Sequence, residues 1–132
     1  MKRYLLLAVA VGFIAAGVQT LAHHSFAATY LEDQSVTIEG ELVQFLMRNP
    51  HAFVHVMVKQ PDGTTVRYVV EWGSPAQLSG RVSRDTLKPG DYVVISGNPG
   101  RNASDHRVRL LTFSRPKDGW SWGLLPDEKF DR

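Results

Sequence analysis

Hydrophobic and polar residues alternate along three successive stretches between residues 36 and 72, a period of two that is typical of half-buried β-strands. The strands are expected over residues 35–47, 51–59 and 64–72. The breaks between them are Arg48-Asn49-Pro50 and Gln60-Pro61-Asp62-Gly63. Pro and Gly supply the restricted and the positive φ values that such turns need. The pattern therefore predicts a three-stranded meander.

The alternation also predicts which side chains face the core. On the second strand one face is wholly aliphatic and is the expected core face: Ala52, Val54, Val56 and Val58. The opposite face carries His51, Phe53, His55 and Met57. The first strand groups Val36, Ile38, Leu42 and Leu46, and Gly40 in its middle predicts a bulge or a sharp coil. The third groups Val66, Tyr68, Val70 and Trp72, with Arg67, Val69 and Glu71 opposite.

After the meander, Ser74 is an expected helix N-cap and Pro75 an expected first helical residue, so a short helix is predicted over residues 75–78. Two further strands are expected over residues 92–97 and 106–114. Three strands, a short helical connection and two strands is the order of an OB-fold barrel. The fold class is therefore predicted to be all-β, a small five-stranded OB-like barrel, whose closure removes exposed strand edges.

The first 22 residues have the pattern of a secretory signal peptide. Lys2 and Arg3 precede an uncharged apolar run, and Ala22 is a small residue at the expected cleavage position. An uncleaved N-terminal anchor is the alternative, since the run is about long enough to span a bilayer. The absence of cysteine excludes a lipoprotein and any disulfide. The expected location is the periplasm, with membrane attachment only if the signal is retained.

The expected organisation is a signal peptide (1–22), an extended N-terminal arm (23–34), the barrel (35–115) and a Trp-containing C-terminal tail (116–132). Without Lys2 and Arg3, 13 basic residues face 13 acidic ones. A chain with no net positive charge lacks the main driving force for nucleic-acid binding, so no nucleic-acid partner is expected. In the tail, Trp120 and Trp122 are expected to cap the open end of the barrel.

Four motifs resemble a family of small exported bacterial proteins of unknown function. They are His23-His24-Ser25-Phe26, Arg48-Asn49-Pro50-His51, Glu71-Trp72-Gly73-Ser74-Pro75 and Thr86-Leu87-Lys88-Pro89-Gly90-Asp91. They are spread over most of the chain that follows the leader. The resemblance implies a periplasmic OB-like barrel and brings no established activity with it.

OB barrels bind ligands across the face of strands two and three. The residues expected to line such a surface are Arg48, Phe53, His55, Arg67, Glu71 and Trp72. The leading hypothesis is therefore a non-catalytic module that binds a small molecule or a periplasmic partner protein. Against it, Trp72 is equally interpretable as a core residue, with Arg67 and Glu71 on a solvated strand face.

The alternative hypothesis is copper binding. If cleavage follows Ala22, the α-amine and imidazole of His23 are able to chelate one copper ion, with His24 or His51 as a further nitrogen ligand. A soft site of Met47 and His51, facing each other across the turn with Met57 or Trp72 nearby, is a variant. That variant is similar to the copper-chaperone barrels of periplasmic efflux systems, but this chain lacks their closely spaced methionine pair. His51 is also interpretable as a residue that only hydrogen-bonds across its turn.

No spacing in the chain matches a phosphate loop, a zinc-protease helix or a nucleophile elbow. The aspartates fall in turns, where Asp is common for local backbone reasons. No catalytic residues are therefore predicted, and no cofactor beyond copper.

Overall fold

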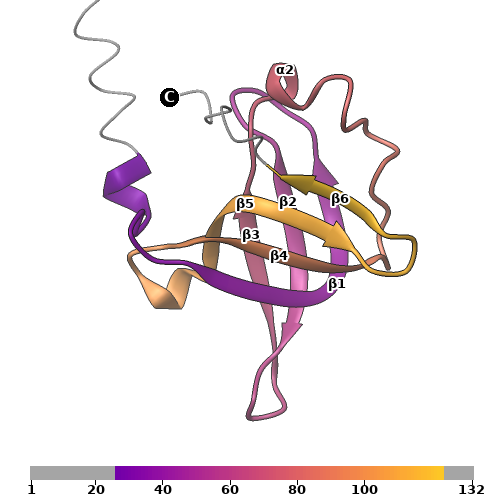
Figure 1. Ribbon diagram of the computed structural model, residues 1–132. Coiled ribbons are helices and arrows are strands. Elements are labelled where there is room, and N and C mark those ends of the chain that lie inside the picture. The colour runs from indigo at the N-terminus through magenta and orange to yellow at the C-terminus, as the bar shows by residue number, and fades with distance from the viewer. Residues whose placement is uncertain (1–25, 124–132) are drawn as a thin grey trace, which may run out of the picture.

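The computed structural model describes residues 26–123 of the 132-residue chain (Figure 1). The strands of this part are β1 (Val36–Leu46), β2 (Phe53–Lys59), β3 (Thr65–Glu71), β4 (Tyr92–Pro99), β5 (Arg107–Arg115) and β6 (Trp120–Gly123). Helix α2 (Pro75–Leu78) connects β3 to β4, and a 3-10 turn, η1 (Ala103–Asp105), precedes β5.

Five strands close into a barrel. β1 pairs with β4 along its first half and with β2 along its second half. β2 pairs with β3, β4 pairs with β5, and a parallel pairing of β3 with β5 closes the circle. This confirms the predicted all-β barrel with one short helix between β3 and β4.

β1 is able to serve two neighbours because it coils at Gly40. A Cβ at this position would lie 2.0 Å from the Met57 carbonyl oxygen, so only glycine allows the close approach. The bulge itself lies further along, where the register shifts between Leu42 and Gln44. This shift reverses the alternation, so the prediction that Leu46 faces the core is wrong. Phe45 takes the inward position, with its ring centroid 5.9 Å from that of Trp72.

The core fills the barrel interior. The aliphatic face predicted for β2 is confirmed, because Ala52, Val54 and Val56 are fully buried. Trp72 is also buried, and its ring stacks on Phe113 at a centroid distance of 5.3 Å. The strand alternation turns its ring inward, as the interpretation of Trp72 as a core residue predicts, and Trp72 also borders a narrow recess beside His51 and Glu71.

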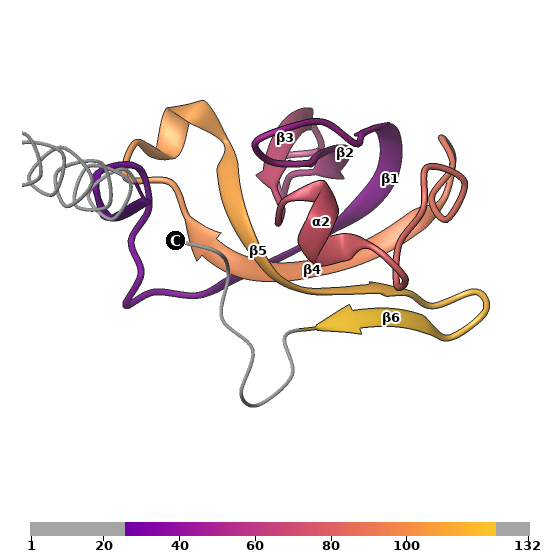
Figure 2. The same cartoon turned by 90° about the horizontal axis from the view of Figure 1, so that it is seen from above.

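α2 forms as its sequence predicts. Pro75 begins the helix, and the Ser74 hydroxyl accepts a hydrogen bond of 3.2 Å from the Gln77 backbone N–H. Leu78 is fully buried and belongs to the core. Seen from above, α2 lies over one end of the barrel (Figure 2).

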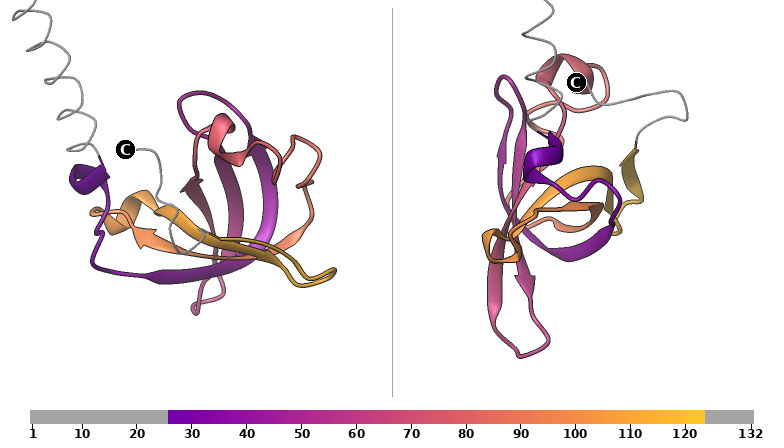
Figure 3. Two further views of the ribbon diagram at one scale, coloured as in Figure 1. Left: turned by 45° about the horizontal axis from the view of Figure 1, so that its top comes forward. Right: turned by 90° about the vertical axis from the view of Figure 1, so that its left-hand side faces the viewer.

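The two flanks of the barrel differ from expectation. Residues 26–29 form a helical turn where an extended arm was expected, and Tyr30, which follows, is fully buried and forms a β-bridge with Gly100. For the tail, only the capping of the barrel by Trp120 and Trp122 was predicted. The tail adds β6 antiparallel to β5, with Trp122 in the core and Trp120 packed against it. The helical turn and the β5–β6 turn lie on opposite sides of the molecule (Figure 3).

Among residues 26–123, no helix has the length and hydropathy needed to cross a membrane. The predicted signal peptide, together with His23 and His24, lies outside the described residues.

Candidate functional site

Glu71 is the centre of a polar cluster at the end of β3. Its side chain is 12% exposed and its two oxygens have separate partners. Oε1 lies 2.7 Å from Nδ1 of His51, and Oε2 accepts a hydrogen bond of 2.5 Å from the Tyr30 hydroxyl. The Arg107 guanidinium approaches Oε2 at 3.6 Å. One carboxylate thus joins the helical-turn region, the β1–β2 loop and β5.

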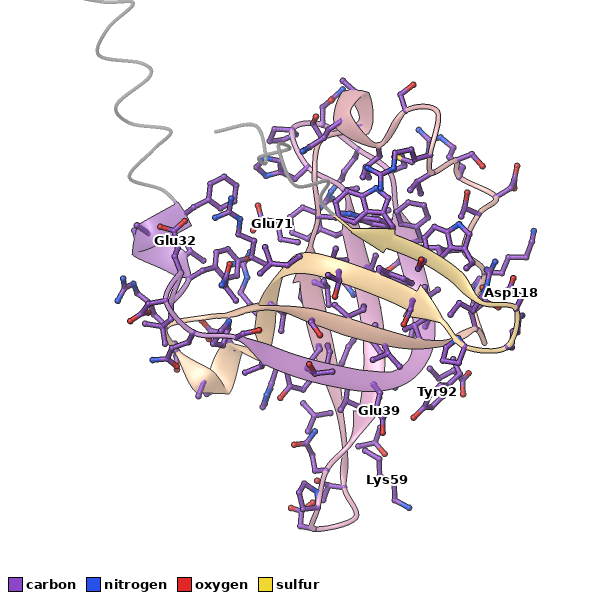
Figure 4. All side chains as sticks on the ribbon, viewed as in Figure 1. Glu32, Glu39, Lys59, Glu71, Tyr92 and Asp118 are labelled. Atoms are coloured by element: carbon purple, nitrogen blue, oxygen red, sulfur yellow. The ribbon has the colours of Figure 1, made fainter. Side chains whose placement is uncertain are left out.

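The sheet register explains why these groups meet. Glu71 is opposite Phe53 on β2 and opposite Arg109 on β5, so its side chain leaves the barrel at the point where β3 closes onto β5. His51 lies just before β2, where Ala52 continues the ladder through hydrogen bonds with Trp72 and Gly73. Figure 4 shows Glu71 on the outside of the barrel, between Glu32 and the core strands.

Tyr30 is held as a neutral hydrogen-bond donor. Burial of the phenol raises the pKa of Tyr30, and the hydrogen bond to the Glu71 carboxylate raises it further. Because a carboxylate oxygen only accepts hydrogen bonds, Nδ1 of His51 is the donor in its own contact with Glu71. The bond fixes the orientation of the imidazole, and in the neutral ring it leaves the lone pair on Nε2. Nε2 makes no hydrogen bond to any residue in the described part of the chain.

Phe26 covers this cluster. Its ring centroid is 5.3 Å from the His51 ring, and the Arg109 guanidinium lies 4.2 Å from the centroid. Arg109 is held in turn by Glu32 at 2.8 Å. A cation over an aromatic face is attractive, so Arg109 fastens the helical turn to the barrel beside His51.

The cluster borders an open hollow of about 270 Å³, lined by Phe26, Thr29, Tyr30, His51, Glu71 and Arg107. A much narrower recess adjoins it and is bordered by Gly73, Gln77 and Arg109. His51 and Glu71 line both spaces.

The other residues predicted for a binding surface lie together on the outer face of β2 and β3, away from this hollow. The Arg48 guanidinium lies 5.1 Å from the Phe53 ring centroid, and Arg67 donates a long hydrogen bond of 3.4 Å to Gln44. Burial, and then the charges of Arg67 and Arg48, lower the pKa of His55. His55 Nδ1 is buried with no hydrogen-bond partner among the described residues.

The predicted metal ligands are only partly described. His51 is in the cluster, whereas Met47 packs against the core. Within residues 26–123, no group of three His, Cys, Asp or Glu side chains is arranged to hold a metal ion. The contact that His51 does make is with Glu71, across 20 residues, and not within its own turn.

Sequence reasoning missed Phe26, Tyr30, Arg107 and Arg109 as parts of a site. Tyr30 and Glu71 are 41 residues apart, so spacing carries no signal for the pair. The alternation on β5 did carry one, since Arg107 and Arg109 both point outward between the buried residues Val108 and Leu110.

The model of a family of unknown function, DUF6152, matches residues 10–109. The chain belongs to this family. No curated protein matches it. The match includes Glu71, His51 and Tyr30 and ends at Arg109, so this DUF6152 chain holds its whole polar cluster within the family's range. The resemblance inferred from the four motifs is thereby confirmed.

Proposed function

We propose that this protein is an exported, non-catalytic binding module, and that its ligand site is the cluster of His51, Glu71 and Tyr30. The observation that carries the proposal is the fixed imidazole of His51. A histidine whose Nδ1 is held by a carboxylate presents Nε2 in one orientation, beside a hollow lined by polar groups. Such an arrangement favours coordination or hydrogen bonding of a ligand over a purely structural role.

The ligand that this geometry favours is a copper ion. In protein metal sites, a histidine ligand commonly donates its other ring N–H to a carboxylate, as His51 does to Glu71. Imidazole and amine nitrogens suit Cu(II). Phe26, which contacts the His51 ring, follows His24 by two residues and His23 by three. The covalent chain can separate their Cα atoms from that of Phe26 by no more than about 7 and 11 Å.

The test is a Cu(II) titration of protein recovered after export, whose mature N-terminus is first established by intact mass. We expect one tightly bound copper per chain beginning at His23, and an electron paramagnetic resonance spectrum typical of nitrogen ligands. His51→Ala is expected to weaken binding at least tenfold. His106→Ala is the matched control, because His106 lies next to Tyr68, outside the cluster, and its removal is expected to leave the affinity unchanged.

Two results would contradict copper binding at this site. One is an affinity that His51→Ala leaves unchanged, and the other is a mature chain that begins after His24. In the second case the binding-module proposal is retained only if another ligand shifts the His51 and Glu71 resonances.

The outer face of β2 and β3 is the second candidate, for a partner protein. The unpartnered Nδ1 of His55, between Arg48 and Arg67, favours a partner that supplies a hydrogen-bond acceptor there. Periplasmic extract added to isotope-labelled protein is expected to broaden the amide signals of Phe53, His55 and Met57, and Arg67→Glu is expected to abolish the effect. Broadening confined to the His51 cluster would exclude this face.

A further inference from the structure

A second hollow lies against the start of β1 and the loop between β4 and β5, and its lining shares Arg107 with the hollow at the His51 cluster. It has a volume of about 430 Å³, which is in the range of small-molecule sites. Its apolar side consists of Val36, Ile38, Tyr68, Pro99 and Val108. We call this hollow the β1–β5 groove.

The charges along the groove have one sign. Among the described residues, the charged side chains that line it are Arg101 and Arg107, and Arg107 also approaches Glu71 at 3.6 Å. Acidic residues flank the lining in sequence, and two of them have partners of their own: Glu32 accepts from Arg109 at 2.8 Å and Asp105 from Asn102 at 3.0 Å. The Nε of Arg101 donates to the Ala27 carbonyl oxygen at 2.6 Å, and within residues 26–123 its two terminal nitrogens make no hydrogen bond. The Nε of Arg107 is buried with no hydrogen-bond partner in the described part of the chain.

The wall of the groove also holds an unusual backbone conformation. His106 has a φ of 46°, in the left-handed region that non-glycine residues seldom adopt. Its ring packs against Tyr68 at a centroid distance of 5.2 Å, and both residues line the groove. Such conformations persist where the surrounding structure holds them, and they are concentrated at binding sites.

We propose that the β1–β5 groove binds a small amphiphilic anion, a molecule with a planar apolar body and one carboxylate or sulfonate group. The apolar body packs on the part-exposed residues Val36, Tyr68 and Pro99, and the anionic group is bound by the terminal guanidinium nitrogens of Arg101. Arginine recognises carboxylate and related anions through paired N–H donors, which explains why charge and shape are both needed. The anion-binding residue Arg101 lines this groove and not the hollow at His51, so the proposal does not rest on copper binding there.

The test uses two fluorescent probes that share an anilinonaphthalene body, 8-anilinonaphthalene-1-sulfonate and the uncharged N-phenyl-1-naphthylamine. We expect the sulfonate to bind one per chain and at least tenfold more tightly than the neutral probe. Amide shifts on binding are expected at Thr37, Tyr68, Ala103 and His106, with the dispersion of a folded spectrum retained.

Three variants locate the binding. Ala103→Trp places a large ring in the groove from the exposed turn η1 and is expected to abolish sulfonate binding. Arg101→Gln is expected to weaken the sulfonate about tenfold and to leave the neutral probe unchanged. Arg84→Gln removes an exposed arginine outside the groove and is expected to change neither.

The proposal is overturned if the two probes bind equally, if Ala103→Trp binds the sulfonate as the unmodified protein does, or if the amide shifts lie on the outer face of β2 and β3. Arg101→Gln leaves the groove walls in place. It therefore tests whether the Arg101 guanidinium binds the sulfonate group, even if Ala103→Trp does not fold.

Discussion

Two carboxylates, Glu71 and Asp91, lie at opposite ends of β5 and have opposite characters. The Asp91 side chain is 6% exposed and that of Glu71 is 12% exposed. Asp91 accepts hydrogen bonds from Lys117 at 2.6 Å, Arg115 at 2.8 Å and the Lys88 backbone N–H at 3.0 Å. Glu71 has one neutral donor in Tyr30, a histidine, and an arginine at 3.6 Å.

The hydrogen-bond donors to the two carboxylates also come from different parts of the chain. Those of Asp91 come from its own turn and from the start of the β5–β6 turn, where Arg115 also binds Asp118. These hydrogen bonds connect the start of β4 to the β5–β6 hairpin. They also occupy both carboxylate oxygens of Asp91, so neither is available to a ligand. Those of Glu71 come from three separate segments, and one of them, His51, has a ring nitrogen to spare. Saturation by local cations is typical of a structural carboxylate, whereas convergence beside a hollow is typical of a binding site.

The largest expected effect is on folding, from Asp91→Ala. Removing a buried carboxylate leaves Arg115 partly uncompensated and frees the Lys88 N–H, so we expect a loss of about 3 kcal/mol in the free energy of unfolding. Chemical denaturation measures it. Copper affinity is expected to be unchanged, and a matching loss of copper binding would show that the two ends are not independent.

Glu71→Gln is expected to lower copper affinity strongly and stability only slightly, the reverse of what is expected for Asp91→Ala. The amide keeps the shape but holds His51 less firmly, so copper affinity is expected to fall about 10- to 100-fold. Titration calorimetry measures this change. The free energy of unfolding is expected to fall by only about 1 kcal/mol. A loss of stability equal to that of Asp91→Ala would make Glu71 a structural residue.

The dependence of stability on pH is a third way to distinguish the Asp91 end of β5 from the Glu71 end. Burial alone would raise the pKa of Asp91, but the hydrogen bonds from Lys117, the Lys88 N–H and Arg115 outweigh it and lower the pKa to about 2. The unfolded chain titrates near its ordinary value of about 3.9, so it takes up the proton first as the pH falls. The stability that Asp91 contributes is therefore complete above about pH 5 and is lost between about pH 4 and 2, on the order of 2 kcal/mol. In Asp91→Asn this part of the acid-unfolding curve is expected to disappear, and its persistence would assign it to another carboxyl group.

The smallest expected effect is that of Lys117→Met. Lys117 contacts Asp91 at 2.6 Å but is 63% exposed, so its ion pair is screened by water and worth less than about 1 kcal/mol. Thermal unfolding at low and high salt measures it. Arg115→Met is the comparison, since that side chain is only 13% exposed and a larger loss is expected. Equal losses for the two variants would contradict this ranking.

Much of the barrel could be read from local pattern. The alternation in β2 placed Val54 and Val56 in the core, and the Ser74-Pro75 pair placed the start of α2. β6 was not predicted, because its four residues are too few to show a period. Its two tryptophans are held by packing against Phe113 and Trp72 and not by local preference. Leu46 was misassigned because a bulge that no residue type signals reverses every face that follows it.

The candidate site also has one part that could be predicted from the sequence and one part that could not. His51 and Glu71 were recognisable as chemically capable residues, but nothing in their spacing joined them. Their pairing follows from the register of Phe53 opposite Glu71, and that of Tyr30 from its bridge to Gly100. Arg107 reaches Glu71 only because β3 and β5 pair in parallel.

The sequence by itself determined the five strands of the barrel and most of the core, since these depend on side-chain periodicity and on backbone preferences that act over a few residues. Only the tertiary structure decided which polar groups meet. The bridge of Tyr30 to Gly100 brings Tyr30 to Glu71, 41 positions away, and the closure of β3 onto β5 brings Arg107 to the same carboxylate. No local preference encodes these contacts.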